Sequence, residues 1–94
     1  MIWEEEMRIV PGFVVRQIVG ETIAIPSGDA ARQLSGLLSL NGSGKLLFDL
    51  LQSEQTQNSL VNALLDTYEI DPPTAQADVA EFLQLLRDAG VLVE

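Results

Sequence analysis

The side chains that most enzymes use for acyl transfer or for zinc binding are missing from this sequence. The chain has 94 residues and contains neither histidine nor cysteine. It therefore offers no imidazole base, no thiolate nucleophile and no nitrogen or sulfur ligand for zinc. Lys45 is the only lysine, and a Ser-Lys dyad built on a solvated lysine at the start of a helix would lack the activation that such a dyad needs. The sequence thus disfavours an enzyme.

Two patterns that could bind phosphate or a metal ion are incomplete. The segment NGSGK at 41–45 has part of a phosphate-binding loop, but Leu46 stands where serine or threonine should follow, and the upstream glycine spacing fails. Its glycines are expected to let the chain turn from strand into helix. The carboxylates at 4–6, Asp78 and Glu81 lack a histidine neighbour or a calcium-loop pattern. We interpret them as solvated faces and expect no metal site and no cofactor.

The charge balance limits the kinds of partner. The chain carries 14 acidic and 5 basic residues, for a net charge of -9, which repels phosphate backbones and anionic lipids. We therefore expect no nucleic acid and no membrane as partners, and a cationic or apolar peptide fits better. The densest apolar run, 46–51, is broken by Asp49, and Glu4, Glu5 and Glu6 stand where a secretory leader would be basic. These features predict a cytoplasmic location.

The first half of the chain has the pattern of a small sheet. Residues 1–12 end in a Pro-Gly turn signal and are interpreted as an arm or first edge element, in which Trp3 either caps the core or contacts a second copy. FVVRQIV and TIAIP, at 13–19 and 22–26, predict a hairpin with a type II′ turn at Gly20-Glu21. After a turn at 27–33, residues 34–40 predict a third strand.

Strand periodicity divides the side chains of this third strand between two faces. Leu34, Gly36, Leu38 and Leu40 fall on the face that we expect to pack on the core, and Leu37 falls on the other.

The second half has the spacing of three helices. They are expected at about 43–52, 57–68 and 72–89, capped by Asn41 or Ser43, by Thr56 and by Asp71, with Gly90 ending the last one. A short strand is expected at 91–93. The apolar stripes of the last two helices are Leu60, Val61, Leu64, Leu65 and Tyr68, and Ala75, Val79, Phe82, Leu83 and Leu86.

This order of elements predicts an α+β fold, a small winged-helix-like domain in which a three-stranded antiparallel sheet is followed by a three-helix bundle. We expect an arm at 1–12 and one domain at 13–94. Two functions remain as alternatives to peptide binding. A winged helix can bind DNA, although the last helix offers Gln76, Gln84 and Arg87 against three acids. A free strand edge can also pair with itself, which would make the chain a structural dimerisation module and a homodimer.

Several segments together resemble one known family. VVRQIVGETIAIPSG, SLNGSGKLLFDLL, SLVNALLDTYEIDP and DVAEFLQLLRDAGVLV are similar to the PqqD-like family, also called the RiPP recognition element, over about residues 13–93. The resemblance implies a non-catalytic peptide chaperone. Such a protein captures the leader segment of a ribosomally made precursor peptide and presents the peptide to a modifying enzyme, a cyclase or a leader peptidase.

In this family the leader adds as a strand beside the third strand, and the third helix forms the other wall of the groove. The resemblance thus implies a pairing edge and a facing wall, which are Leu37, Leu38, Ser39 and Leu40, and Ala75, Asp78, Val79, Phe82 and Leu85. Helical projection gathers Asp78, Glu81 and Leu85 on one exposed strip of the helix. That strip suits a leader with apolar anchors and a basic residue.

One departure from the family bears on the pathway. Members that act in pyrroloquinoline quinone synthesis usually carry a Pro-Glu step after the second strand, whereas this chain has Pro26-Ser27-Gly28. The departure argues against a quinone-cofactor role. A stand-alone recognition protein of a lasso-peptide pathway, or of another modified-peptide pathway, is the alternative.

Overall fold

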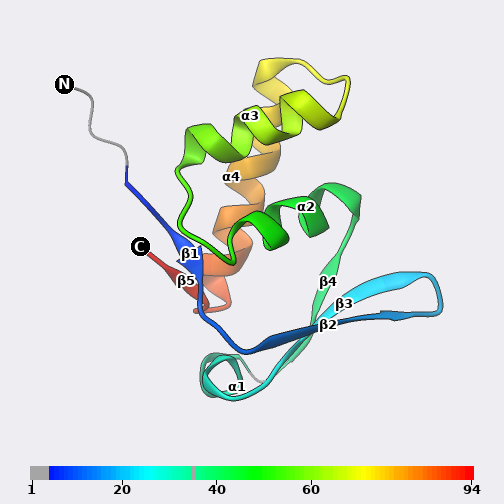
Figure 1. Ribbon diagram of the computed structural model, residues 1–94, viewed down its shortest axis with the longest axis vertical. Coiled ribbons are helices and arrows are strands. Elements are labelled where there is room, and N and C mark those ends of the chain that lie inside the picture. The colour runs from blue at the N-terminus through cyan, green and yellow to red at the C-terminus, as the bar shows by residue number, and fades with distance from the viewer. Residues whose placement is uncertain (1–4, 35) are drawn as a thin grey trace.

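The strands β1 to β4 lie in the first half of the chain, and helices make up most of the second half (Figure 1). The computed structural model describes residues 5–34 and 36–94, so the expectation for Trp3 lies outside the described residues. The elements are β1 (Arg8–Ile9), β2 (Phe13–Ile18), β3 (Glu21–Pro26), α1 (Asp29–Gln33), β4 (Leu38–Leu40), α2 (Gly42–Leu50), α3 (Gln57–Thr67), α4 (Pro72–Asp88) and β5 (Leu92–Val93). The predicted fold class, an α+β domain with a three-stranded antiparallel sheet followed by helices, is confirmed.

The predicted hairpin forms, but its turn lies one residue earlier than expected. Ile18 pairs with Glu21, so the two turn residues are Val19 and Gly20. Both have positive φ, 50° and 79°, which is the geometry of a type I′ turn. The predicted type II′ turn over Gly20-Glu21 is therefore wrong. The β-branched Val19 occupies a conformation that favours glycine or asparagine, and its side chain is 98% exposed.

A short helix replaces the turn expected at 27–33. Helix α1 spans only Asp29–Gln33 and buries a single side chain, Ala30, so it carries no apolar stripe that could have predicted it. The third strand is correspondingly shorter than predicted and begins at Leu38. From residue 37 onward the alternation agrees with the prediction, because Leu38 and Leu40 are buried and Leu37 is exposed. Gly36, predicted on the core face, precedes the strand and is exposed. Ser35 lies outside the described residues.

The three remaining helices begin at predicted caps. The Asn41 side chain caps α2, and Thr56 forms a capping box with Ser59 at the start of α3. Asp71 caps α4 by accepting a hydrogen bond from the Thr74 N–H at 2.9 Å. Hydrogen bonds from Thr74 also hold the pKa of the Asp71 carboxyl below its usual range. Gly90 follows α4 with φ 76°, as expected for a C′ glycine.

The N-terminal segment is tied to the far end of the chain. Strand β1 pairs antiparallel with β5, Arg8 opposite Val93 and Ile9 opposite Leu92. Met7 exchanges two backbone hydrogen bonds of 2.8 Å with Gln55. Nearby, a hydrogen bond with Glu54 and repulsion from its charge raise the pKa of the Glu6 carboxyl. The domain boundary at 12 and 13 stays a prediction.

One core joins the sheet to the helices. The ring of Phe13 on β2 meets that of Phe48 on α2 edge to face, with centroids 5.5 Å apart. The hairpin projects from this core in a molecule of 37 × 33 × 19 Å (Figure 1). In the described residues no helix is long and apolar enough to cross a membrane. The largest fully buried side chains are Phe48, Leu47, Leu51, Leu60, Leu64, Leu83, Leu86, Val79 and Val91.

Candidate functional site

The sheet ends in a short strand whose outer side is open. The strand order is β2-β3-β4, so β4 is an edge strand. The N-terminal segment pairs with β5 and Gln55 and leaves this edge free, as far as residues 5–34 and 36–94 show. An edge strand presents unpaired backbone N–H and C=O groups that another chain can use as a template.

The pairing register indicates which backbone groups face outward. In an antiparallel sheet, successive residues of a central strand direct their N–H and C=O groups to opposite neighbours. Ile18 and Glu21 close a two-residue turn and thus form a hydrogen-bonded pair. Because the direction alternates along β3, the backbone N–H and C=O groups of Thr22 and Ala24 point toward β4, where these residues pair with Leu40 and Leu38. The intervening residue of β4, Ser39, directs its N–H and C=O to the open edge.

The chain leaves β4 through a tight corner into α2. Asn41 has an extended backbone, and its Oδ1 accepts hydrogen bonds from the Gly44 N–H at 2.7 Å and from the Ser43 hydroxyl at 3.2 Å. This side chain satisfies a backbone donor that would otherwise be unpaired at the helix start. Asparagine capping thus accounts for the corner.

The expectation that the glycines of NGSGK make this turn is wrong. Neither Gly42 nor Gly44 has a positive φ, so the corner uses no conformation reserved for glycine. Gly44 is needed instead for packing. A Cβ placed there would lie 2.9 Å from Asn41 Oδ1 and 3.5 Å from a ring carbon of Phe82. The missing side chain lets α4 approach the start of α2.

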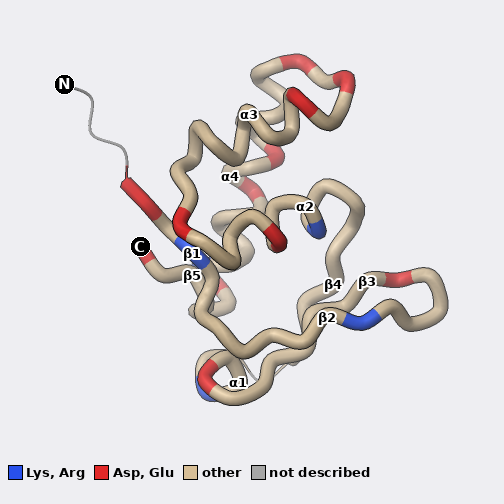
Figure 2. Tube along the Cα trace, viewed as in Figure 1, with Lys and Arg blue, Asp and Glu red and all other residues tan. Residues whose placement is uncertain are grey.

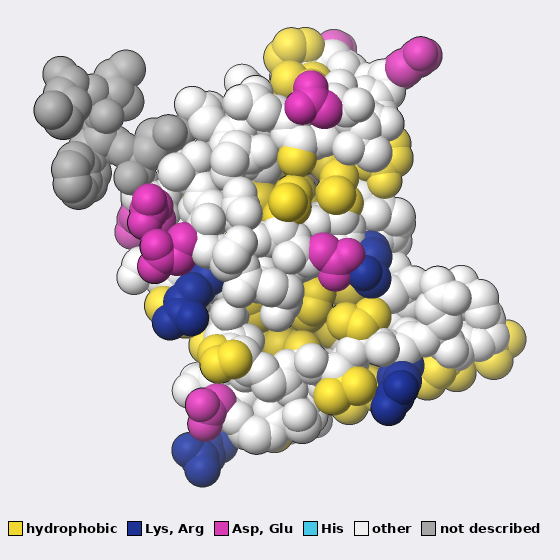
Figure 3. All heavy atoms as spheres, in the orientation of Figure 1, with side chains coloured by type: hydrophobic (Ala, Val, Ile, Leu, Met, Phe, Trp, Pro, Cys, Tyr) yellow, Lys and Arg dark blue, Asp and Glu magenta, His cyan; other side chains and the backbone are white. Residues whose placement is uncertain are grey.

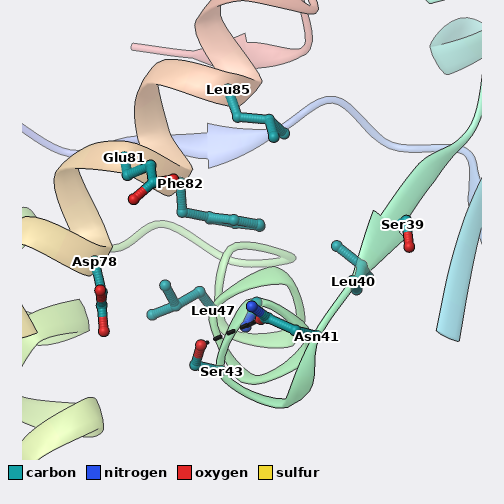
Figure 4. Close-up of a pocket in the computed structure, with 10 residues that line it drawn as sticks. Ser39, Leu40, Asn41, Ser43, Leu47, Asp78, Glu81, Phe82 and Leu85 are labelled. Carbon is teal, nitrogen blue, oxygen red and sulfur yellow. Dashed lines mark hydrogen bonds between the residues drawn. The ribbon is translucent and has the colours of Figure 1, made fainter. Parts of the chain in front are cut away.

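A groove of about 360 Å³ separates β4 from α4, with the start of α2 at its base (Figure 4). The side chains of Phe82 and Leu85 point from α4 toward β4. The residues that line the groove are Ser39, Leu40, Asn41, Ser43, Gly44, Leu47, Asp78, Glu81, Phe82 and Leu85.

The structure brings five of the nine predicted site residues together. Ser39, Leu40, Asp78, Phe82 and Leu85 all line the groove, and the side chain of Leu85 is 46% exposed. Their contact with a peptide stays a prediction.

The other four predicted residues lie elsewhere. Leu37 precedes β4, is 59% exposed and does not line the groove. Leu38 is buried on the core side of β4, and Ala75 and Val79 are fully buried within α4. The three buried side chains contact the core, which leaves Ala75 and Val79 no accessible surface for a guest.

The sequence did not single out the base of the groove as a binding surface. Asn41, Ser43, Gly44 and Leu47 come from α2 or its cap, and they were interpreted as a corner and an apolar helix face. Only the packing of α2 against α4 places them beside the predicted wall. Glu81 had been placed on the same strip of the last helix as Asp78 and Leu85, and it does line the groove.

The groove has an acidic and apolar lining. Among residues 5–34 and 36–94, Asp78 and Glu81 are the only charged side chains that line it, and neither lysine nor arginine contributes to the lining. Lys45, on α2, forms an ion pair with Asp49. Acidic positions also gather on α3, on the connection to α4 and on α4 itself (Figure 2). The described residues include no cluster of side chains that could hold a metal ion.

Two solved structures share this fold. One is described as TbiB1 in complex with the TbiA(beta) leader peptide, with 22% identity, a TM-score of 0.68, and coverage of 90% of this chain and 93% of that one. The other is a lasso peptide synthetase B1 complexed with the leader peptide, with 18% identity, a TM-score of 0.69, and coverage of 94% and 98%. No curated protein sequence matches the chain.

A protein-family model decides the family. Residues 15–92 match the model described as coenzyme PQQ synthesis protein D (PqqD), a span that includes most of β2, all of β3 and β4, the groove, and all of α2, α3 and α4. The resemblance noted in the sequence is thereby confirmed, and the chain belongs to the PqqD family.

Proposed function

We propose that this protein binds the leader segment of a ribosomally made precursor peptide as an added strand on β4 and delivers the peptide to a modifying enzyme, a cyclase or a leader peptidase. The observation that carries the proposal is the open edge of β4, which faces α4 across the groove. A guest strand there would pair with the backbone of Ser39 on one side and place alternate side chains against α4 on the other.

The family and the fold support this proposal. The PqqD family is non-catalytic, so the chain is not an enzyme. Both solved structures compared above are described as complexes with a leader peptide. Strand addition supplies hydrogen bonds that do not depend on the guest's sequence, and the groove supplies the selectivity. We place this activity in the cytoplasm, where ribosomal precursors are made.

The pathway is proposed from one sequence feature. Pro26-Ser27-Gly28 departs from the Pro-Glu step of quinone-pathway members, and a lasso-peptide pathway or another modified-peptide pathway fits this departure. A short precursor gene beside genes for a cyclase, a protease or a radical enzyme would support the assignment. Mixing the purified chain with that precursor and that enzyme would test delivery, because the chain should accelerate modification of the full precursor but not of its isolated core segment.

Leu85→Asp tests the groove wall. We expect the wild-type chain to bind a fluorescein-labelled leader of the neighbouring precursor with a Kd of about a micromolar or tighter, since ordering the peptide offsets part of the contact energy. The substitution places a charge against the apolar end of the groove and should weaken binding at least about tenfold. Fluorescence anisotropy measures the affinity, and circular dichroism shows whether the variant folds.

A matched variant separates a local effect from a general one. Val19→Asp makes the same change of charge at the hairpin tip, where the side chain is 98% exposed and does not line the groove. It should bind like the wild type. If Leu85→Asp also binds like the wild type, α4 is not the wall of the binding site.

DNA binding finds no support in the last helix. The single basic residue of α4 is Arg87, and its Nε donates to Glu94 Oε1 at 2.7 Å. The groove side of α4 carries Asp78 and Glu81, which would repel a phosphate backbone. A gel shift at low salt with random-sequence duplex DNA should show no complex.

A further inference from the structure

The side chains that α4 presents to the groove are ordered by chemistry along the helix. Asp78 and Glu81 come first in the chain, Phe82 follows, and Leu85 lies one turn later. Phe82 and Leu85 point toward β4, with Leu85 opposite Ser39 and Leu40 (Figure 4). The groove thus has an apolar end and an acidic end.

The two carboxylates have no cationic partner within the described part of the chain. The ion pairs found there join Arg32 to Asp29, Lys45 to Asp49 and Arg87 to Glu94, and none includes Asp78 or Glu81. All basic side chains that form these pairs lie outside the groove lining. The rim therefore keeps two negative charges that a guest can neutralise, in a molecule whose net charge is already -9.

The apolar part of the groove is an accessible surface. Leu85 is 46% exposed, and Phe82 is only partly buried against the core. In the space-filling view, apolar side chains are visible on the surface near the centre of the molecule (Figure 3). A large apolar side chain of a guest would cover Phe82 and Leu85, and their removal from water would favour binding.

The spacing of these two surfaces matches a strand. Four residues of helix, from Asp78 to Phe82, rise about 6 Å. Two residues of an extended strand advance about 6.7 Å and return to the same face. A guest side chain that packs on Phe82 and Leu85 is thus separated from one that reaches the carboxylates by two positions along the guest.

We infer that the groove selects a guest strand with a large apolar residue and an arginine or lysine two positions away, the apolar side chain on Phe82 and Leu85 and the cation between Asp78 and Glu81. This inference rests on the proposed function and specifies the class of peptide that the site takes. An acidic guest would meet two like charges and be rejected. Arginine or lysine suits the rim because its alkyl stem can cover Phe82 while its charge reaches the carboxylates.

A random-peptide library tests the inference without knowledge of the natural precursor. Displayed peptides of about 12 residues, long enough for one strand with flanks, are selected on the full chain, on Asp78→Asn/Glu81→Gln, and on Asp66→Asn/Glu69→Gln. The last variant removes the same charge from exposed positions that do not line the groove. The wild type and this control should enrich an apolar residue with a cation two positions to either side. The groove variant should keep the apolar residue and lose the cation.

A mutant cycle with the best selected peptide measures how much the charge pairs between the guest's cation and the two carboxylates contribute to affinity. Replacing its cation by glutamine should weaken binding to the wild type about two- to fivefold at low salt, as expected for solvent-exposed charge pairs. The same replacement should leave binding to Asp78→Asn/Glu81→Gln unchanged. Added salt should reduce only the first difference.

The outcomes separate the two claims. If the library yields groove-dependent binders with no cation at the second position, the charge selectivity is wrong and strand capture stands. If the peptides bind Leu85→Asp as well as the wild type, or if none binds the wild type at all, strand capture in this groove is wrong and the selectivity falls with it.

Discussion

Single residues at the corner between β4 and α2 decide whether the groove is open. Gly44 lies where the base of the groove meets α4, since a Cβ there would be 2.9 Å from Asn41 Oδ1 and 3.5 Å from Phe82. Gly42, two positions earlier in the same helix, has room, because its Cβ would meet only the Tyr68 hydroxyl at 3.5 Å. The two glycines therefore form a matched pair for substitution.

We expect Gly44→Ala to be less stable than Gly42→Ala by about 1 kcal/mol. Alanine favours a helix over glycine, but at position 44 the Cβ displaces the Asn41 side chain from its capping position, and loss of such a cap costs about 1 kcal/mol. Urea denaturation of the two variants measures this difference. Equal stabilities would contradict the packing role of Gly44.

The same pair tests the groove. Gly44→Ala moves the Asn41 side chain, which lines the groove, and should weaken leader binding, whereas Gly42→Ala should bind like the wild type. Wild-type binding by Gly44→Ala would show that the groove does not depend on this contact, and an equal loss of binding in both variants would show that the effect is not specific to position 44.

At the scale of elements, the features set by neighbouring residues could be predicted from the sequence, whereas the contacts between distant segments could not. The caps Asn41, Thr56 and Asp71 and the apolar stripes of α3 and α4 depend on neighbours within one or two turns, and they are confirmed with one exception. Tyr68, predicted in the stripe of α3, follows the helix as its C-cap and is 37% exposed. The pairing of β1 with β5 joins Arg8 to Val93, and no local pattern encodes it. Helix α1 was missed because it buries one alanine.

The candidate site likewise has a part that the sequence predicts, the wall on α4, and a part that it does not, the base of the groove. The wall residues Asp78, Phe82 and Leu85 follow from helical spacing and the family resemblance, and they do line the groove. The base of the groove depends on how closely α2 approaches α4. That distance is set by Gly44 against Phe82, a contact between helices that sequence periodicity does not describe.

The β2–β3 hairpin contains a strained element that substitution should relieve. Val19 holds φ at 50°, a region that costs a β-branched residue about 1 kcal/mol or more. Val19→Asn gives the Asn-Gly pair that type I′ turns prefer and should raise the free energy of unfolding by about 1 kcal/mol. Thermal or urea denaturation measures the change. An unaltered or lower stability would contradict the turn type.

For the whole molecule, the open edge of β4 is also a site where two copies could pair. A leader that fills this edge should prevent such pairing. With saturating leader we expect light scattering to report one protomer of 10.2 kDa plus one peptide. A mass of two protomers under these conditions would mean that copies associate through another surface, or that the leader does not occupy β4.

The pairing of β1 with β5 has a further consequence for the architecture of larger proteins. Arg8 lies opposite Val93, so the chain enters and leaves the domain at neighbouring points, on two strands that the groove does not use. Units with adjacent ends are tolerated as insertions in the surface loop of a host protein. We therefore expect that this domain can be inserted into a surface loop of an enzyme, which would give the enzyme a peptide-binding domain while its own fold stayed intact.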